Sequence, residues 1–224
     1  MISCATNSPN TENSSNERQV DHSAVRNSTT PRTSKPTKEK STDIPVAHNK
    51  EFLRNYMKET YRNLENAVKG LSPEQLNFKS SSETWSILEC LEHIVESEPK
   101  LWAMAEPVLA PPATPERRSE IQITDDQVMT MIINREYKAK ASAEMQPSGK
   151  YTNTQMALSQ LESQRKVILK DIDQYTMEDL RNRIFEMPMG ASDVYQFILF
   201  IPGHTARHTL QILEIKTHPD FPKN

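Results

Sequence analysis

Apolar residues recur three and four positions apart in several long stretches of this chain, the spacing that gives a helix one buried face. Over residues 46–69 this pattern stands between Pro45 and Gly70, residue types that favour the start and the end of a helix. The same spacing predicts three further long helices, over residues 85–109, 153–174 and 192–216.

Capping signals mark where two of the predicted helices begin. Ser86-x-x-Glu89 forms a capping box directly before an apolar run, and Thr124-x-x-Gln127 forms a second one. The second box predicts a shorter helix that continues to about Lys138. No segment shows a convincing strand pattern, and no internal repeat is present. We therefore expect an all-α protein with four long helices and one short extra helix.

The last predicted helix contains Pro202 and Gly203 immediately before His204. A proline inside a helix removes one backbone hydrogen bond and crowds the carbonyl group four residues earlier, here that of Ile198. We expect a kink or a bulge at this point.

The first 45 residues differ in composition from the rest of the chain. Twenty of them are Ser, Thr or Asn and none is aromatic, so they cannot bury enough apolar surface to offset the entropy cost of ordering. We predict a disordered tail over residues 1–45 and one folded domain over residues 46–224. Two interpretations of the tail remain open. The protein is cytoplasmic with a variable tail, or it is anchored to lipid through Cys4 and its true start codon lies upstream.

Charge and cysteine content exclude several classes of function. The net charge is −3, and the basic residues are interleaved with acidic ones, so no nucleic-acid surface is expected. No apolar run approaches the roughly 20 residues that a membrane span needs. Cys4 and Cys90 are too few for a disulfide framework. The expected partner is a small-molecule substrate.

The candidate chemistry centres on His204 and His208, which lie four residues apart in the last predicted helix. Residues at this spacing lie on the same helix face, and the surrounding apolar residues indicate that this face is buried. Two inward imidazoles are either core side chains bonded to carbonyl groups or part of a metal site. His93 is the best candidate for a third ligand, although a lone histidine is more often structural.

Three imidazoles would bind zinc, nickel, copper or iron, and their number does not identify the ion. They would leave at least one coordination position open, which is typical of catalytic rather than structural zinc. A bound water or thiol would then have a lowered pKa.

Neighbouring residues add possible supporting roles. Arg207 could bind an anionic substrate group or form a surface ion pair. Gln211 and Glu89 could orient an imidazole from behind, although most such glutamates are simply solvated. Cys90 is expected to be a buried, inert thiol.

Several motifs together resemble the DinB-like superfamily, close to its YfiT-type, metal-dependent branch. The resemblance covers about residues 47–222. It is carried by Trp85-Ser86-Ile87 with Glu89 and His93, by the segments Leu158–Arg165 and His204–Lys216, and by the closing segment Pro219–Pro222.

The resemblance implies a four-helix bundle in which residues 110–152 form a long crossover, and it implies that His93, His204 and His208 bind a divalent metal ion. Members of the superfamily include thiol S-transferases that use a low-molecular-weight thiol. Thiol S-transfer is therefore the first functional expectation. The alternatives are a metal-dependent hydrolase and a non-catalytic binding or stress-response module. The resemblance also makes a homodimer plausible.

Overall fold

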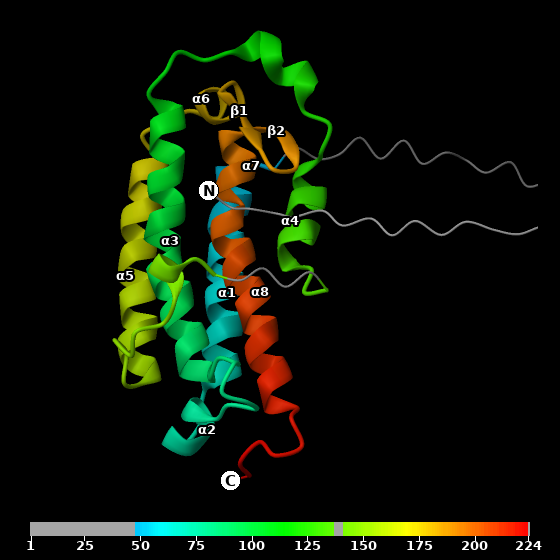
Figure 1. The fold of residues 1–224 in the computed structure, drawn as a ribbon. Helices are drawn as coiled ribbons and strands as arrows, with labels where there is room; N and C mark the ends of the chain where they lie inside the picture. Colours follow the sequence, from blue (N-terminus) through cyan, green and yellow to red (C-terminus); the bar gives the residue numbers. More distant parts are fainter. Residues whose placement is uncertain (1–47, 137–140, 224) are drawn as a thin grey trace, which may run out of the picture. The chain divides into compact units, whose positions relative to one another are not determined.

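The computed structural model describes residues 48–136 and 141–223. The tail predicted over residues 1–45 lies outside the described residues. Four long helices dominate the described part (Figure 1), and they agree with the four that the hydrophobic spacing predicts. They are α1 (Lys50–Val68), α3 (Ile87–Leu109), α5 (Thr154–Ile172) and α8 (Phe200–Lys216).

The four long helices form a four-helix bundle. Helix α1 packs against α8 and α5, and α3 packs against the same two helices, so α1 and α3 lie diagonally opposite each other. In Figure 1, α3 and α5 run in the same direction, which requires a long connection between the end of one and the start of the other. The expected bundle with a long crossover is confirmed.

The described residues of the crossover contain three short helical elements. These are the 3-10 helix η1 (Pro115–Glu120), the helix α4 (Asp125–Ile133) and the 3-10 helix η2 (Ala143–Met145). The capping box at Thr124 and Gln127 is present and begins α4, which packs against α8. Helix α4 ends at Ile133, earlier than the predicted end, because the chain turns extended at Asn134.

Outside the crossover, further short helices connect the bundle: α2 (Pro73–Asn77), α6 (Met177–Arg181) and α7 (Val194–Ile198). Among the described residues, no helix combines the length and the apolar character needed to cross a membrane.

The expectation of no strand is wrong. Strands β1 (Ile184–Met187) and β2 (Gly190–Asp193) pair antiparallel, and Gly190 adopts a φ of 109° at the turn. Each strand has only four residues, too few for an alternating pattern to stand out in a sequence. The side chain of Phe185 packs against the buried core, so tertiary contacts stabilise this hairpin.

The last predicted helix is divided. Its N-terminal part is β2 followed by α7, and α8 begins after Leu199. Pro202 is the third residue of α8, a position whose backbone N–H has no partner within that helix. The expected interruption is present, and it lies between Ile198, whose carbonyl group Pro202 would crowd, and Phe200.

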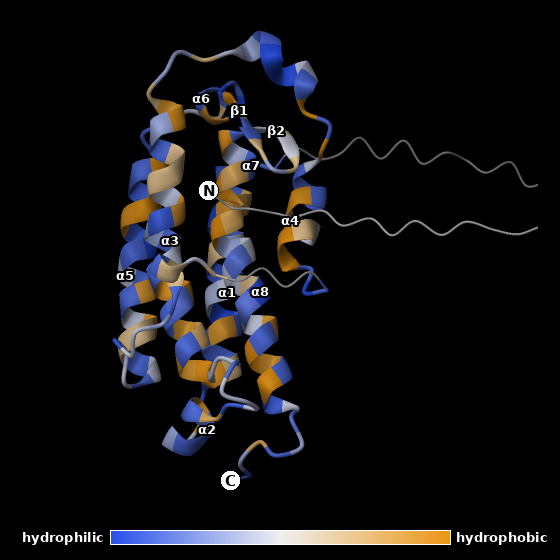
Figure 2. Ribbon diagram, viewed as in Figure 1, coloured by the Kyte–Doolittle hydropathy of each residue, from blue (hydrophilic) through white to orange (hydrophobic). Residues whose placement is uncertain are grey.

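Two apolar clusters fill the two ends of the bundle. One includes Leu53, Trp102 and Ile168, and the other includes Leu64, Leu91 and Leu161. Hydrophobic and hydrophilic residues alternate along the same long helices in Figure 2, as expected for helices with one buried face. Buried polar side chains occur on the same helices, and they include the candidate histidines His93 and His208, while His204 is half-buried.

Candidate metal centre

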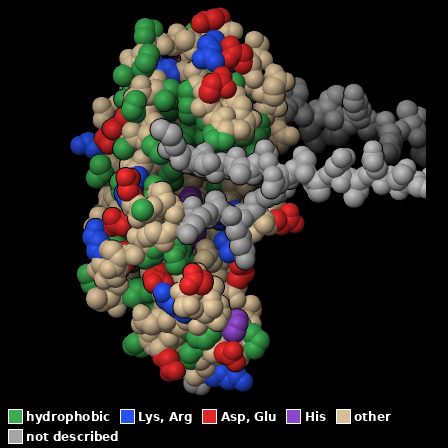
Figure 3. Space-filling view, in the orientation of Figure 1, with side chains coloured by type: hydrophobic (Ala, Val, Ile, Leu, Met, Phe, Trp, Pro, Cys, Tyr) green, Lys and Arg blue, Asp and Glu red, His purple; other side chains and the backbone are tan. Residues whose placement is uncertain are grey.

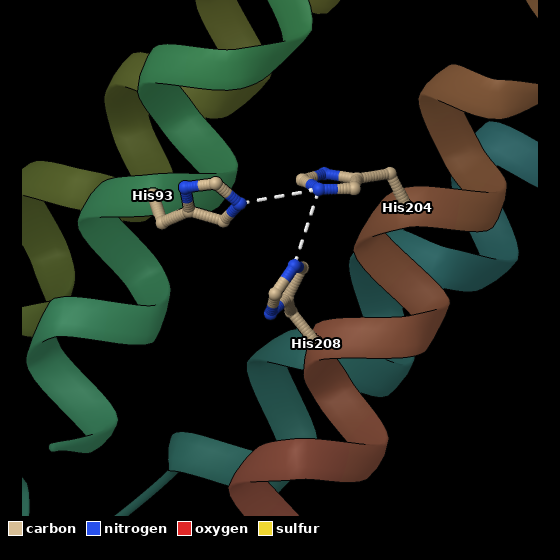
Figure 4. Close-up of side chains that lie close together, drawn as sticks. All are labelled: His93, His204 and His208. Atoms are coloured by element: carbon tan, nitrogen blue, oxygen red, sulfur yellow. Dashed lines mark hydrogen bonds between the residues drawn. The ribbon is translucent and has the colours of Figure 1, made fainter. Parts of the chain in front are cut away.

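Helices α3 and α8 bring the three predicted histidines together. His93 lies in the second turn of α3, whose start is fixed by the capping box of Ser86 and Glu89. His204 and His208 lie one turn apart on α8. Figure 4 shows the three rings pointing toward one another across the gap between the two helices.

The Nε2 atoms of the three rings converge. The Nε2 atom of His204 lies 3.2 Å from that of His93 and 3.1 Å from that of His208. One ligand nitrogen from each ring lies within 4.8 Å of the others, an arrangement that can hold a metal ion. No fourth His, Cys, Asp or Glu joins this group among the described residues.

Hydrogen bonds on the far side of two rings fix which nitrogen carries the proton. The Nδ1 atom of His93 lies 2.9 Å from the carbonyl oxygen of Met145, which can only accept. The Nδ1 atom of His208 lies 2.9 Å from Oε1 of Gln211. Arg135 donates to the same Oε1 atom, which confirms that this amide atom is the oxygen. Both rings therefore carry their proton on Nδ1 and turn a lone pair on Nε2 toward the centre.

These tautomers make the centre suitable for a cation. The Nε2 atom of His204 can donate one proton at most, so at least one of the two inward lone pairs of His93 and His208 is left without a hydrogen bond. Its Nδ1 atom is buried and has no hydrogen-bond partner among the described residues. In tetrahedral zinc sites with Zn–N distances of about 2.0–2.1 Å, ligand nitrogens lie roughly 3.3 Å apart. The two observed separations are close to this value.

Burial keeps all three imidazoles neutral at physiological pH. Desolvation lowers the pKa of His93 below its ordinary value and lowers that of His204 well below it. Desolvation and the neighbouring His93 lower the pKa of His208 to about 3. Neutral imidazole is the form that binds metal ions.

Aromatic and polar groups enclose the cluster. The ring of Trp85 lies 4.7 Å from that of His93 and 6.1 Å from that of His208, measured between ring centroids. In the space-filling view, histidine atoms are visible in a recess near the middle of the face shown (Figure 3). A groove of about 1010 Å³ on the described surface is lined instead by residues of α1, α4 and α8, and none of the three histidines lines it.

The structure places Gln211 where the sequence analysis expects a supporting residue, behind the ring of His208. Glu89 lies elsewhere. One of its carboxylate oxygens accepts from the backbone N–H of Ser86, and the other accepts from Lys79. Glu89 therefore stabilises the start of α3 and does not touch His93.

Arg207 contacts the crossover. Its guanidinium donates to the carbonyl oxygens of Ile132 and Asn134 at the end of α4. On the same side of α8, a Cβ atom added to Gly203 would lie 3.0 Å from the Ile132 side chain. Gly203 and Arg207 thus allow α4 to pack closely on the helix that carries two of the histidines.

Cys90 is completely buried in the apolar cluster at the α2 end of the bundle. Burial raises the pKa of its thiol to about 12. As expected, Cys90 is an inert core residue.

Sequence reasoning missed the crossover residues that support the histidines. Met145 acts through its backbone carbonyl, a group that every residue carries, so no sequence signal exists for it. Further along the crossover, the backbone N–H groups of Ser148, Gly149 and Lys150 donate to the carboxylate of Glu92 on α3. Glu92 thereby holds the loop that follows Met145 against α3.

Comparison with known proteins places the chain in a family. YuaE, an uncharacterized protein of Bacillus subtilis (strain 168), is 29% identical over 151 residues, which cover 67% of this chain and 89% of YuaE. YfiT from Bacillus subtilis is described as "a probable metal-dependent hydrolase with an unusual four-helix bundle topology". Its structure matches with a TM-score of 0.50 at 14% identity, over 76% of this chain and 89% of that chain.

The family model of the DinB superfamily matches residues 56–212, a stretch that begins within α1 and includes all three histidines of the cluster. The match covers well over half of the chain, and the fold agrees with it. This chain belongs to the DinB superfamily.

Proposed function

We propose that this protein is a metal-dependent enzyme in which His93, His204 and His208 hold one divalent ion. The observation that carries the proposal is the convergence of three Nε2 atoms. In two of these rings, those of His93 and His208, the proton is on Nδ1, so a lone pair on Nε2 faces the centre. Such lone pairs repel one another in the absence of a positive charge between them. A buried cluster of this kind is therefore better explained by a ligand than by the stability of the fold.

Three protein ligands leave a coordination position for a small molecule, which favours a catalytic over a structural role. When bound, the ion would lower the pKa of a water or thiol ligand and so supply a nucleophile at neutral pH. Zinc, nickel and iron all accept imidazole ligands, and availability would decide among them.

The glutamates near His93 are the nearest candidates for a general base that would activate a nucleophile. Four of them lie within five residues of it, and each already binds other groups. Glu89 caps α3, Glu92 binds the loop after Met145, and Glu96 binds Lys150 and Tyr151. Glu98 forms an ion pair with Arg165. A mechanism that needs a free carboxylate as general base is therefore disfavoured.

Thiol S-transfer fits this environment as the first candidate reaction. A thiol gives up its proton more readily than water does and becomes nucleophilic without a strong base. In this proposal a low-molecular-weight thiol is the co-substrate, the three histidines orient it, and Trp85 and the crossover exclude water around it.

Hydrolysis is the second candidate, and the description of YfiT as a probable metal-dependent hydrolase favours it. A metal-activated water also needs no separate carboxylate base. The two candidates differ in one requirement, because only S-transfer depends on an added thiol.

Elemental analysis of the purified full chain, combined with an activity screen, tests the proposal. We expect one equivalent of a divalent metal in the wild-type protein and its loss in His93→Ala and His208→Ala. His218→Ala is the matched control, because His218 lies on the C-terminal segment outside the cluster, and it should keep the metal. Electrophilic substrates should turn over only with added thiol, whereas ester or amide substrates that turn over without thiol would favour hydrolysis.

The same measurements separate an enzyme from a non-catalytic binding module. Metal-dependent turnover that disappears with a chelator and in His208→Ala supports the enzyme. Wild-type protein without stoichiometric metal, even after incubation with zinc, nickel or iron(II), would contradict the proposed site.

A further inference from the structure

A buried hydrogen-bond network includes Thr205, the residue that follows His204 in the sequence. Thr205 lies on α8, and its hydroxyl group donates to Oε1 of Glu98 at 2.6 Å. The same hydroxyl oxygen accepts from Nη2 of Arg165 at 2.9 Å. All three side chains are buried, with exposed fractions of 0% for Thr205 and Glu98 and 5% for Arg165.

This network connects the helices that carry the histidines. Glu98 lies on α3, five residues after His93, and Thr205 lies on α8, directly after His204. Arg165 lies on α5 and binds both of them. The hydroxyl group of Thr205 therefore fixes how α8 sits against α3, close to the point where the imidazoles of the two helices meet.

His204 depends on such a constraint more than the other two histidines do. The ring of His93 is held by the Met145 carbonyl, and the ring of His208 is held by Gln211. The Nδ1 atom of His204 has no hydrogen-bond partner among the described residues. The direction of this ring is therefore set by packing and by the position of its own backbone.

We propose that Thr205 is a positioning residue for His204. By holding α8 to Glu98 and Arg165, its hydroxyl group places the His204 imidazole where the His93 and His208 imidazoles meet it. This inference rests on the proposed metal site. Ligand groups must be held within about 0.5 Å of their productive geometry, so a small shift of α8 would weaken the site.

The chain contains a matched control for this role. Thr60 on α1 is also buried, and its hydroxyl oxygen accepts from Nη1 of Arg165 at 3.2 Å. Its own proton goes to the carbonyl oxygen of Met57 within the same helix. Thr60 thus belongs to the same network, but it is on a helix that carries none of the three histidines.

The experiment compares zinc affinity in full-length wild-type protein, Thr205→Val, Thr205→Ser and Thr60→Val. Affinity is measured by competition with a chromophoric chelator, and the visible spectrum of the Co²⁺ form reports the ligand geometry. We expect Thr205→Val to bind zinc about 10-fold more weakly, the lower end of the range for losing a group that hydrogen-bonds a metal ligand, because Thr205 acts one contact further out, and to alter the Co²⁺ spectrum. Thr205→Ser restores the hydroxyl group and should recover both properties. Thr60→Val should reduce the thermal stability and leave zinc affinity and the Co²⁺ spectrum near those of the wild type.

Two results would overturn the inference on its own. One is wild-type zinc affinity in folded Thr205→Val, and the other is an equal loss of affinity in Thr205→Val and Thr60→Val, which would indicate a general effect of destabilisation. Failure of the wild-type chain to bind either ion would instead overturn the proposed metal site, and the inference with it.

A second pair of variants covers the case in which Thr205→Val does not fold. Thr205→Ala and Thr60→Ala leave space for a water molecule that can bind Glu98 and Arg165 in place of the hydroxyl group. The same contrast is expected, with weaker zinc binding only in Thr205→Ala. Equal affinities in this pair would likewise overturn the inference.

Discussion

Two buried polar clusters lie side by side in this helix bundle, and they differ in how completely their groups are satisfied. In the first, Arg165 donates to Glu98, Thr60 and Thr205, and the carboxylate of Glu98 accepts at both oxygens. In the second, His93 and His208 turn Nε2 lone pairs toward the ring of His204, and the Nδ1 atom of His204 has no partner among the described residues.

The difference indicates two kinds of role. A buried ion pair whose charges and hydrogen bonds are matched contributes to the uniqueness of the fold, and it needs nothing from outside the chain. A buried cluster with unmatched lone pairs costs stability until a cation joins it. The helices of one bundle thus contain a polar network complete in itself and, next to it, the three histidines of the proposed metal site.

The largest expected effect comes from removing Arg165 from the first cluster, where it pairs with Glu98. Arg165→Ala should lower the free energy of unfolding by about 3–5 kcal/mol, because it leaves the fully buried carboxylate of Glu98 without its partner. Urea denaturation measures this change. Lys166→Ala is the control, because Lys166 forms an exposed pair with Glu162 and should change stability by no more than about 1 kcal/mol. Equal losses in the two variants would contradict the assignment of Arg165 to a structural core.

A second variant sharpens the contrast by changing the histidine cluster while leaving the Arg165 network intact. Gln211→Leu removes the acceptor that orients the ring of His208, and zinc affinity should fall about 10–100-fold. Gln211→Glu keeps an acceptor at this position and should retain the affinity of the wild type. Chelator competition distinguishes the two. If both variants bound zinc like the wild type, the orienting role of Gln211 would be excluded.

The smallest expected effect is a pH dependence of the metal-free protein. Burial lowers the pKa of His208 to about 3, whereas a histidine in the unfolded chain titrates near its ordinary value of 6.5. As the pH falls below 6.5 the unfolded state binds the proton first, so stability decreases toward acid pH. From pH 7 to about pH 5.5 this amounts to roughly 1 kcal/mol for one protected imidazole.

His208→Leu should lose less stability than the wild type over the same pH range, when both are unfolded by urea in the presence of a chelator. Parallel pH profiles in the two proteins would show that His208 does not remain neutral in the folded state.

Much of the fold can be read along the chain. The long helices follow from the spacing of residues such as Leu53 and Leu64, and the capping boxes at Ser86 and Thr124 mark where α3 and α4 begin. These signals act over a few residues and depend on local backbone geometry, so they can be recognised in the sequence without the tertiary structure. The hairpin β1–β2 could not be read in this way, because its two four-residue strands are stabilised by contacts with distant parts of the core.

The candidate site shows the same division. The i, i+4 spacing of His204 and His208 on an apolar face predicted that both rings point inward, and the resemblance to a family identified His93 as their partner. The capping-box spacing already placed Glu89 at the start of α3, and the structure shows Glu89 in that role rather than behind an imidazole. Nothing in the spacing indicated that Arg207 would bind the end of α4.

The sequence by itself determined that this protein is helical, where its long helices lie, and that two histidines share one buried face, because helix periodicity is a local property. Only the tertiary structure decided which groups surround those histidines. From the crossover, Met145 binds His93 and Arg135 binds Gln211 behind His208, and Thr205 binds Glu98 on another helix. Such contacts join residues far apart in the chain, and they form only when the helices pack in one particular order.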